Sequence, residues 1–111
     1  MSDCIFCKIV AGDIPCDKVY EDDLMIAIKD VAPAAPVHVL LIPKVHTENI
    51  LTVDSKLCLH MLSKIKQIVD KLGIAEKGFR VVINTGDDGG QTVKHLHIHI
   101  IGGKVLGWPP C

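Results

Sequence analysis

Apolar positions recur along this chain with two periods, and each period predicts a different kind of element. Helical spacing holds in a short segment at 4–11, which ends at Gly12, and in one long segment at 55–72. Asp54 and Gly73 have the residue types that cap the two ends of the long helix. Runs of β-branched and aliphatic residues, bounded by turns and prolines, predict strands at 19–21, 24–29, 37–42, 79–84 and 95–101. The pattern predicts one α+β domain with an antiparallel sheet and a helix packed on one face.

The last predicted strand alternates histidine with aliphatic residues. Successive side chains of a strand point to opposite faces, so His95, His97 and His99 are expected to share one face. The aliphatic residues between them would face the core: Leu96, Ile98 and Ile100. A solvated strand face ordinarily carries Thr, Lys or Glu, so a row of imidazoles indicates a functional cleft.

Two kinds of chemistry fit three histidines on one face. Imidazole is a common transition-metal ligand. It is also a nucleophile at one ring nitrogen when the other nitrogen donates its proton to a fixed acceptor such as a backbone carbonyl. The loop at 85–92 favours a phosphate substrate, because Gly89 and Gly90 would let the backbone approach closely and turn its N–H groups inward. Gln91 and Thr92 add side-chain donors.

Composition and charge narrow the range of partners. The chain has 111 residues, enough for one domain with a real core, and its formal net charge is −1. Basic and acidic residues are mixed, so no overall field would draw the protein to nucleic acid or to a membrane surface. The start of the chain lacks a basic segment followed by an apolar run, and no apolar stretch approaches the span of a bilayer. We therefore expect a soluble, intracellular protein.

The cysteines indicate a reducing compartment and a candidate metal site. Their number, five, is odd and their spacing irregular, which fits a reducing compartment better than a disulfide framework. Cys58 is interpreted as a core residue and Cys111 as a tail residue. Cys4 and Cys7 would lie on one side of the short helix, where both thiolates could bind one tetrahedral Zn²⁺ with two further ligands from elsewhere. Two buried thiols are the alternative, and a redox pair is less favoured because no thioredoxin-like βαβ unit is predicted.

These residues resemble the histidine triad superfamily, in its Hint branch. The defining run, His-φ-His-φ-His-φ-φ with φ an aliphatic residue, stands complete at 95–101. The resemblance covers nearly all of 4–110, including Asp30, 36–38, 42–46, Asn84 and 89–92. Gly102-Gly103 and the ending Trp108-Pro109-Pro110 are similar to Hint proteins specifically.

The resemblance implies a fold, a location and an activity. The fold would be a single domain over 1–111, with a five-stranded antiparallel sheet, one long helix and a short N-terminal helix, and with the sheet continued across a homodimer. The location would be the cytoplasm, with the nucleus as a further compartment. The activity would be hydrolysis of purine nucleoside phosphoramidates such as adenosine 5′-monophosphoramidate, through a nucleotidyl-histidine intermediate. AMP, GMP or their phosphoramidates would be the ligands. A dinucleoside polyphosphate hydrolase and a non-enzymatic adaptor that binds nucleotide and zinc are the alternatives.

The resemblance also assigns roles to residues. His97 matches the nucleophile, His99 the residue that contacts phosphate and handles the proton, and His95 and His38 the supporting histidines. Asp30 matches the carboxylate that binds the ribose hydroxyls. The remaining substrate contacts are Val31 beside the ribose, a base pocket of Ile5, Phe6, Ile9, Ile28 and Leu40, a phosphate side of Asn84, Gly90, Gln91 and Thr92, and Trp108 reaching the neighbouring subunit's site.

The same resemblance implies a zinc site. Some triad proteins hold a zinc ion with a cysteine pair at this place, which here would be Cys4 and Cys7, together with the histidine positions of His46 and His95. Other Hint proteins lack the cysteine pair, so the ion would be structural. Lys29 stands where some members have histidine, and it is expected to influence which amine leaves.

Overall fold

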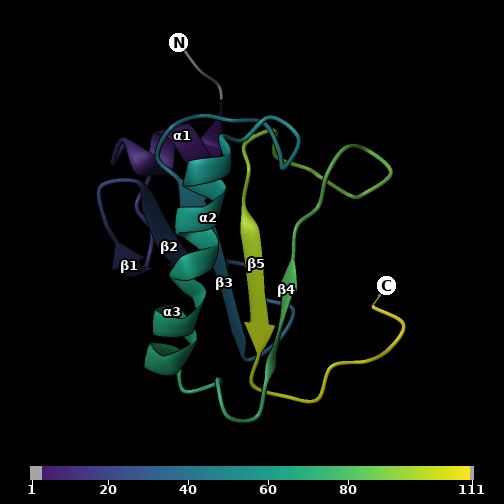
Figure 1. The fold of residues 1–111 in the computed structure, drawn as a ribbon. Helices are drawn as coiled ribbons and strands as arrows, with labels where there is room; N and C mark the ends of the chain where they lie inside the picture. The colour runs from purple at the N-terminus through teal and green to yellow at the C-terminus, as the bar shows by residue number, and fades with distance from the viewer. Residues whose placement is uncertain (1–3, 111) are drawn as a thin grey trace.

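The structure is a computed structural model, described here over residues 4–110. Five strands form one antiparallel sheet in the order β1-β2-β3-β5-β4 (Figure 1). Their bounds are β1 Lys18–Glu21, β2 Met25–Lys29, β3 Val37–Pro43, β4 Phe79–Val82 and β5 Ile98–Gly102. β5 comes last in the chain but lies between β3 and β4, so the strand of the histidine run is flanked on both sides. The predicted α+β class with an antiparallel sheet is confirmed.

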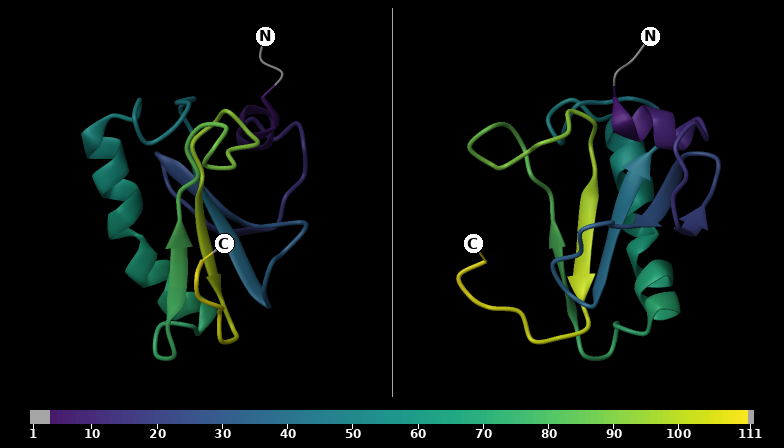
Figure 2. Two further views of the ribbon diagram at one scale, coloured as in Figure 1. Left: turned by 90° about the vertical axis from the view of Figure 1, so that its right-hand side faces the viewer. Right: turned by 180° about the vertical axis from the view of Figure 1, so that it is seen from behind.

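Helices cover the two faces of the sheet unequally (Figure 2). α2 (Ser55–Ser63) and α3 (Ile65–Leu72) follow one another along one face, where Met61 and Ile68 enter the main apolar core. α1 (Ile5–Val10) lies at the other face and contributes Phe6 and Ile9 to a second apolar cluster. Because side chains alternate along each strand, the central strands supply both cores at once.

The expected alternation of the histidine run is confirmed, although its strand is shorter than predicted. Leu96, Ile98 and Ile100 all lie in the main core beneath α2 and α3. β5 begins at Ile98, so His95 and His97 precede the strand. The ladder with β3 starts only at the pair Leu41–Ile98, and the chain before it turns away toward α1 and the loop after β3. β4 likewise ends at Val82 instead of Asn84, where the chain leaves the ladder.

The long helical segment is confirmed, with one interruption. Asp54 caps its start by accepting hydrogen bonds from the N–H groups of Lys56 and Leu57, and Gly73 ends it in the left-handed conformation at φ 76°. Lys64 divides α2 from α3, and its φ of −90° and ψ of −8° keep the chain on the same course. Cys58 is half-buried and not part of either core, which corrects its prediction as a core residue. Cys111 lies outside the described residues.

Across residues 4–110, none of the helices combines the length and the apolar character that crossing a membrane requires.

Candidate functional site

The His97 imidazole is held in one tautomer by the backbone. Its Nδ1 atom is 2.8 Å from the carbonyl oxygen of His95. A carbonyl only accepts hydrogen bonds, so Nδ1 carries the ring proton and donates it. The other nitrogen, Nε2, therefore presents a lone pair. This is the arrangement that a nucleophilic imidazole requires.

His38 and His99 form a second ordered pair on the same face. The Ala34 N–H donates to His38 Nδ1 at 3.0 Å, so the proton of neutral His38 is on Nε2. That nitrogen is 2.9 Å from His99 Nδ1 and 3.4 Å from Asp30 Oδ2. His99 Nδ1 then accepts from His38, which places the proton of neutral His99 on Nε2.

The His97 and His99 rings are neighbours, with centroids 5.2 Å apart. Burial, followed by the nearby His97 and His38, lowers the pKa of His99 to about 4, and Asp30 opposes the shift. His99 is therefore neutral at pH 7 in the free chain. Its Nε2–H is a hydrogen-bond donor beside a lone pair on His97, a combination suited to binding and splitting a phosphoryl compound.

The structure brings most of the predicted base-pocket residues together. Phe6, Ile9, Ile28 and Leu40 belong to the second apolar cluster, and Leu40 is the register partner of His99. The other two apolar positions predicted to contact substrate lie outside this cluster: Ile5 is 47% exposed and Val31 fully exposed.

Lys29 lies on the opposite face from the histidines. Its register partner is Val39, which belongs to the main core beneath the helices. Its ammonium group is 3.5 Å from Asp17 Oδ2. The expected influence of Lys29 on the leaving amine therefore lacks a direct route, because side chains alternate and Ile28 takes the histidine face.

Hydrogen-bond donors of the loop before the histidines bond to nearby backbone carbonyls. The N–H groups of Gly90 and Gln91 donate to carbonyls within the loop, at 3.0 Å each. Of the two glycines whose N–H groups were expected to turn toward phosphate, Gly90 therefore uses its N–H inside the turn. The buried Gln91 side chain donates to Glu48 and Val93 carbonyls and accepts from Gly86 N–H. It therefore shapes the loop.

Two further loop positions have clear local reasons. The Asn84 amide donates to the Gly89 carbonyl at 2.7 Å, which ties the two ends of the turn. A Cβ at Gly89 would lie 2.3 Å from the Thr85 carbonyl oxygen, so only glycine fits there. Thr92 is exposed.

Four side chains converge beside the nucleophile: Cys4, Cys7, His46 and His95. Their ligand atoms all lie within 4.8 Å of one another. Cys4 Sγ is 3.3 Å from His95 Nδ1, and Cys7 Sγ is 3.2 Å from His46 Nδ1. The two imidazole Nδ1 atoms are 3.2 Å apart.

This cluster fits a tetrahedral metal ion. His95 Nε2 donates to the Pro43 carbonyl at 2.9 Å, so its Nδ1 turns a lone pair toward the sulfurs. Donor atoms that converge in this way can hold a cation between them. Zinc–nitrogen bonds of about 2.0–2.1 Å at tetrahedral angles separate two ligand nitrogens by roughly 3.3 Å, close to the observed spacing.

Three backbone groups complete the site and were not found from the sequence: the carbonyls of His95 and Pro43 and the N–H of Ala34. Each fixes which nitrogen of a ring carries the proton. The prolines at 33, 36 and 43 are the only local signal for them, since they make the chain around Ala34 and Pro43 rigid.

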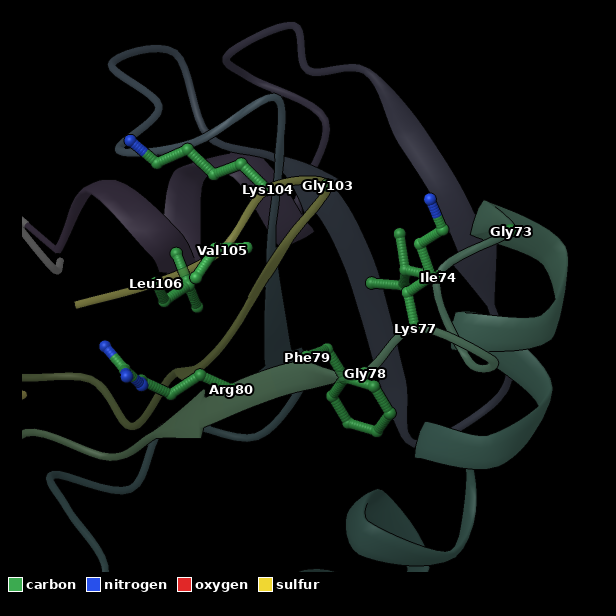
Figure 3. A pocket seen from close by; sticks show the side chains of 10 residues that line it. All are labelled: Gly73, Ile74, Lys77, Gly78, Phe79, Arg80, Gly103, Lys104, Val105 and Leu106. Atoms are coloured by element: carbon green, nitrogen blue, oxygen red, sulfur yellow. The ribbon is translucent and has the colours of Figure 1, made fainter. Parts of the chain in front are cut away.

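The groove in Figure 3 lies away from these histidines. It holds about 560 Å³ and is formed where α3 leads into β4 and where the chain leaves β5, with Ile74, Phe79 and Leu106 among its walls. His97 is at the opposite end of β5. Arg80, which also lines the groove, donates from its guanidinium to the Gly107 carbonyl at 2.7 Å, and Trp108 is 81% exposed.

Comparison with known proteins gives a consistent result. The HIT domain family model matches residues 11–106. A HIT-like protein of Synechococcus elongatus is 53% identical over 97% of this chain and 96% of its own length. Protein HitA of Neisseria gonorrhoeae is 48% identical over 95% of this chain and all of its own.

Two solved structures show the same similarity. The crystal structure of a HIT family hydrolase from Legionella pneumophila has a TM-score of 0.94 and 41% identity, covering 98% of this chain and 100% of its own. A histidine triad protein from Clostridium difficile has a TM-score of 0.91 and 46% identity, with 96% of each chain covered.

Proposed function

The chain belongs to the HIT domain family, and on that premise we propose that it is a hydrolase of the Hint branch. Its substrates are purine nucleoside phosphoramidates, and it cleaves their P–N bond through a nucleotidyl-His97 intermediate. One observation carries the proposal: the hydrogen bond from His97 Nδ1 to the His95 carbonyl places the proton of the neutral ring on Nδ1 and the lone pair on Nε2. An imidazole in this state attacks phosphorus without a separate base.

The first step forms one bond and breaks one. His97 Nε2 attacks the α-phosphorus, a P–Nε2 bond forms and the P–N bond to the amine breaks. The amine must gain a proton as it leaves, and His99 Nε2 is the group placed beside His97 to supply it. On substrate binding His99 takes up one proton from solvent, because the substrate phosphate favours its charged form against the burial that disfavours it in the free chain, and it returns this proton to solvent when the product leaves.

The second step returns the enzyme to its starting state. A water molecule attacks the phosphorus, its proton passes to His99 Nε2, and the bond to His97 Nε2 breaks to release the nucleoside monophosphate. His97 Nδ1 keeps its proton on the His95 carbonyl throughout. Two displacements in line give overall retention of configuration at phosphorus.

The remaining assignments place the substrate above the histidine face. Asp30 binds the ribose hydroxyls with the oxygens that now contact His38 and the Ala32 N–H. The apolar cluster of Phe6, Ile9, Ile28 and Leu40 receives the base. Asn84 and 90–92 form the border next to the phosphate.

Turnover of a fluorogenic adenosine tryptamine phosphoramidate tests the proposed activity. We expect release of tryptamine and AMP with a kcat/KM well above that for diadenosine polyphosphates. A preference for the dinucleotides would replace the proposal by a dinucleoside polyphosphate hydrolase. Binding of AMP without turnover of either substrate would replace it by a non-enzymatic adaptor.

The pKa of His99 provides a test on the free and nucleotide-bound chain. In the free chain His99 should titrate at about 4, well below its ordinary value of 6.5, because burial disfavours its charged form. AMP should raise this pKa, since the phosphate stabilises the imidazolium. An NMR titration of the ring protons measures both values, and Asp30→Asn should lower the free value further. A His99 pKa that AMP leaves unchanged contradicts the assigned proton transfer.

We also propose a structural zinc ion on Cys4, Cys7, His46 and His95. The fit of the donor atoms described above supports it. Four protein ligands leave no open position for water or substrate, so the ion would stabilise the fold around α1. No step of the reaction passes through it.

We propose a homodimer formed through β4 and the helix face. β4 is an edge strand, and its residues Phe79 and Val81 are 37% and 39% exposed. Leu59 and Leu62 of α2 are 69% and 43% exposed. Pairing of two β4 edges would satisfy unpaired backbone groups and cover apolar surface together.

A charge on this edge should separate the subunits. Val81→Asp would bury a carboxylate between two β4 strands, so light scattering should show a monomer at micromolar concentration where the parent chain is a dimer. Leu51→Asp is the matched control, because Leu51 is 82% exposed and lies before α2. A parent chain that is itself monomeric refutes the dimer.

Trp108 is proposed to act across this dimer. Its side chain is 81% exposed in one chain, and the tail that carries it is held to β4 by Arg80. We expect it to reach the neighbouring subunit's site and to influence which amine leaves. Unchanged substrate preference in Trp108→Ala would refute that role.

A further inference from the structure

The Phe6 ring lies between the thiol–imidazole cluster and the nucleophile. The thiol–imidazole cluster is Cys4, Cys7, His46 and His95. Phe6 is 7% exposed and meets His97 nearly edge on, with centroids 4.9 Å apart and an interplanar angle of 73°. It meets His95 in the same manner at 6.0 Å and 86°. Phe6 therefore touches a member of the cluster and the nucleophile with one ring.

α1 depends on tertiary contacts for its position. It has six residues, far fewer than an isolated helix needs for stability in water. Cys4 is its N-cap and accepts the Cys7 N–H on sulfur, while both sulfurs contact His95 Nδ1. The start of the helix, where Phe6 stands between the two cysteines, is thus fixed by the thiol–imidazole cluster.

The hydrogen bond of His97 constrains only one atom of its ring. With Nδ1 on the His95 carbonyl, the ring can still tilt and move Nε2 away from the line of attack. The Phe6 ring and the His99 ring, with centroids 4.9 Å and 5.2 Å from that of His97, limit that tilt. An edge-to-face contact has a preferred geometry, which an aliphatic side chain does not supply.

We infer that Phe6 is a positioning residue, through which the thiol–imidazole cluster holds the His97 ring in the orientation for attack. The inference rests on the proposed function for its kinetic consequence. It differs from a role in the base pocket alone, because it predicts an effect on the chemical step for every substrate, with or without a purine. On this inference, the thiol–imidazole cluster and Phe6 act together to orient the His97 ring.

Kinetics separate the two roles of Phe6. Phe6→Leu should lower kcat by roughly tenfold for adenosine phosphoramidates and for a phosphoramidate that lacks a base, because a small misplacement of a reacting group is costly. Phe6→Tyr keeps the ring and should restore kcat to within about twofold. Val10→Ala, on the same helix, is the control and should leave kcat unchanged. A higher KM for adenosine substrates with unchanged kcat overturns the inference.

A double-mutant cycle tests the link to the cluster. If the cluster acts on His97 through Phe6, Cys7→Ala should lower kcat, and the double variant should be no slower than the slower single variant. Independent, multiplicative losses would overturn the link.

NMR of the His97 ring provides a second test, which does not require turnover of a substrate. The Phe6 ring current should shift the His97 Hε1 resonance, and Phe6→Leu should remove that shift. Supplying zinc should sharpen the shifted resonance, and a chelator should move it toward the Phe6→Leu position. A His97 Hε1 resonance that is unchanged both by Phe6→Leu and by removal of zinc contradicts the inference. A chain that shows the NMR response but turns over no phosphoramidate would contradict the proposed function alone.

Discussion

We expect His97→Asn to abolish turnover of nucleoside phosphoramidates, with a loss of kcat on the order of 10³-fold or more. The amide of asparagine has no nitrogen lone pair able to attack phosphorus, so the covalent step cannot start. The asparagine N–H₂ can still donate to the His95 carbonyl that now accepts from His97 Nδ1. The pocket therefore persists, and calorimetry should show AMP binding within a few-fold of the parent chain.

His60→Asn is the matched control for this substitution. His60 lies on α2, and its Nε2 pairs with Asp22 at 2.8 Å, remote from the histidine run. It should keep kcat within about twofold, at some cost in stability. Full turnover in His97→Asn would require another nucleophile or direct attack by water.

We expect Cys7→Ala to abolish binding of the proposed zinc ion and to lower the melting temperature by more than about ten degrees. One ligand of four is lost, and the remaining imidazole and sulfur atoms at 3.2–3.3 Å spacing no longer form a tetrahedral set. Elemental analysis should give near one zinc per parent chain and almost none in the variant, and calorimetry measures the melting temperatures.

Cys16→Ala serves as the control for the zinc prediction. Cys16 is half-buried and packs against the second apolar cluster, outside the four-residue set. It should retain zinc and melt within a few degrees of the parent chain. A parent chain purified without zinc, and as stable as one supplied with it, would remove the structural role.

The alternation of the histidine run could be read from the sequence because it depends on local geometry. The side chains alternate even before β5 begins: Leu96 lies in the main core, while His95 and His97 both contact Phe6. The interruption at Lys64 could not be read in this way. The apolar spacing runs through it, and its backbone stays in the right-handed region.

The partners of each histidine depend on contacts that spacing does not encode. Cys4 and His95 are 91 positions apart, and the resemblance alone connected them. The tautomers depend on the N–H of Ala34 and the carbonyls of Pro43 and His95, backbone groups that nearly all residue types share, so no sequence pattern marks them. The Gly90 N–H was wrongly expected to face phosphate for a related reason, because it donates to the Asp87 carbonyl within the turn.

Acid-quenched single turnover with an adenosine phosphoramidate tests the covalent mechanism most directly. Mass spectrometry of the intact chain should show an adenylyl adduct that forms before AMP is released, and peptide mapping should place it on His97. The His97→Asn chain should show none. Release of AMP from the parent chain without any adduct, or an adduct on another residue, would contradict the nucleotidyl-His97 account.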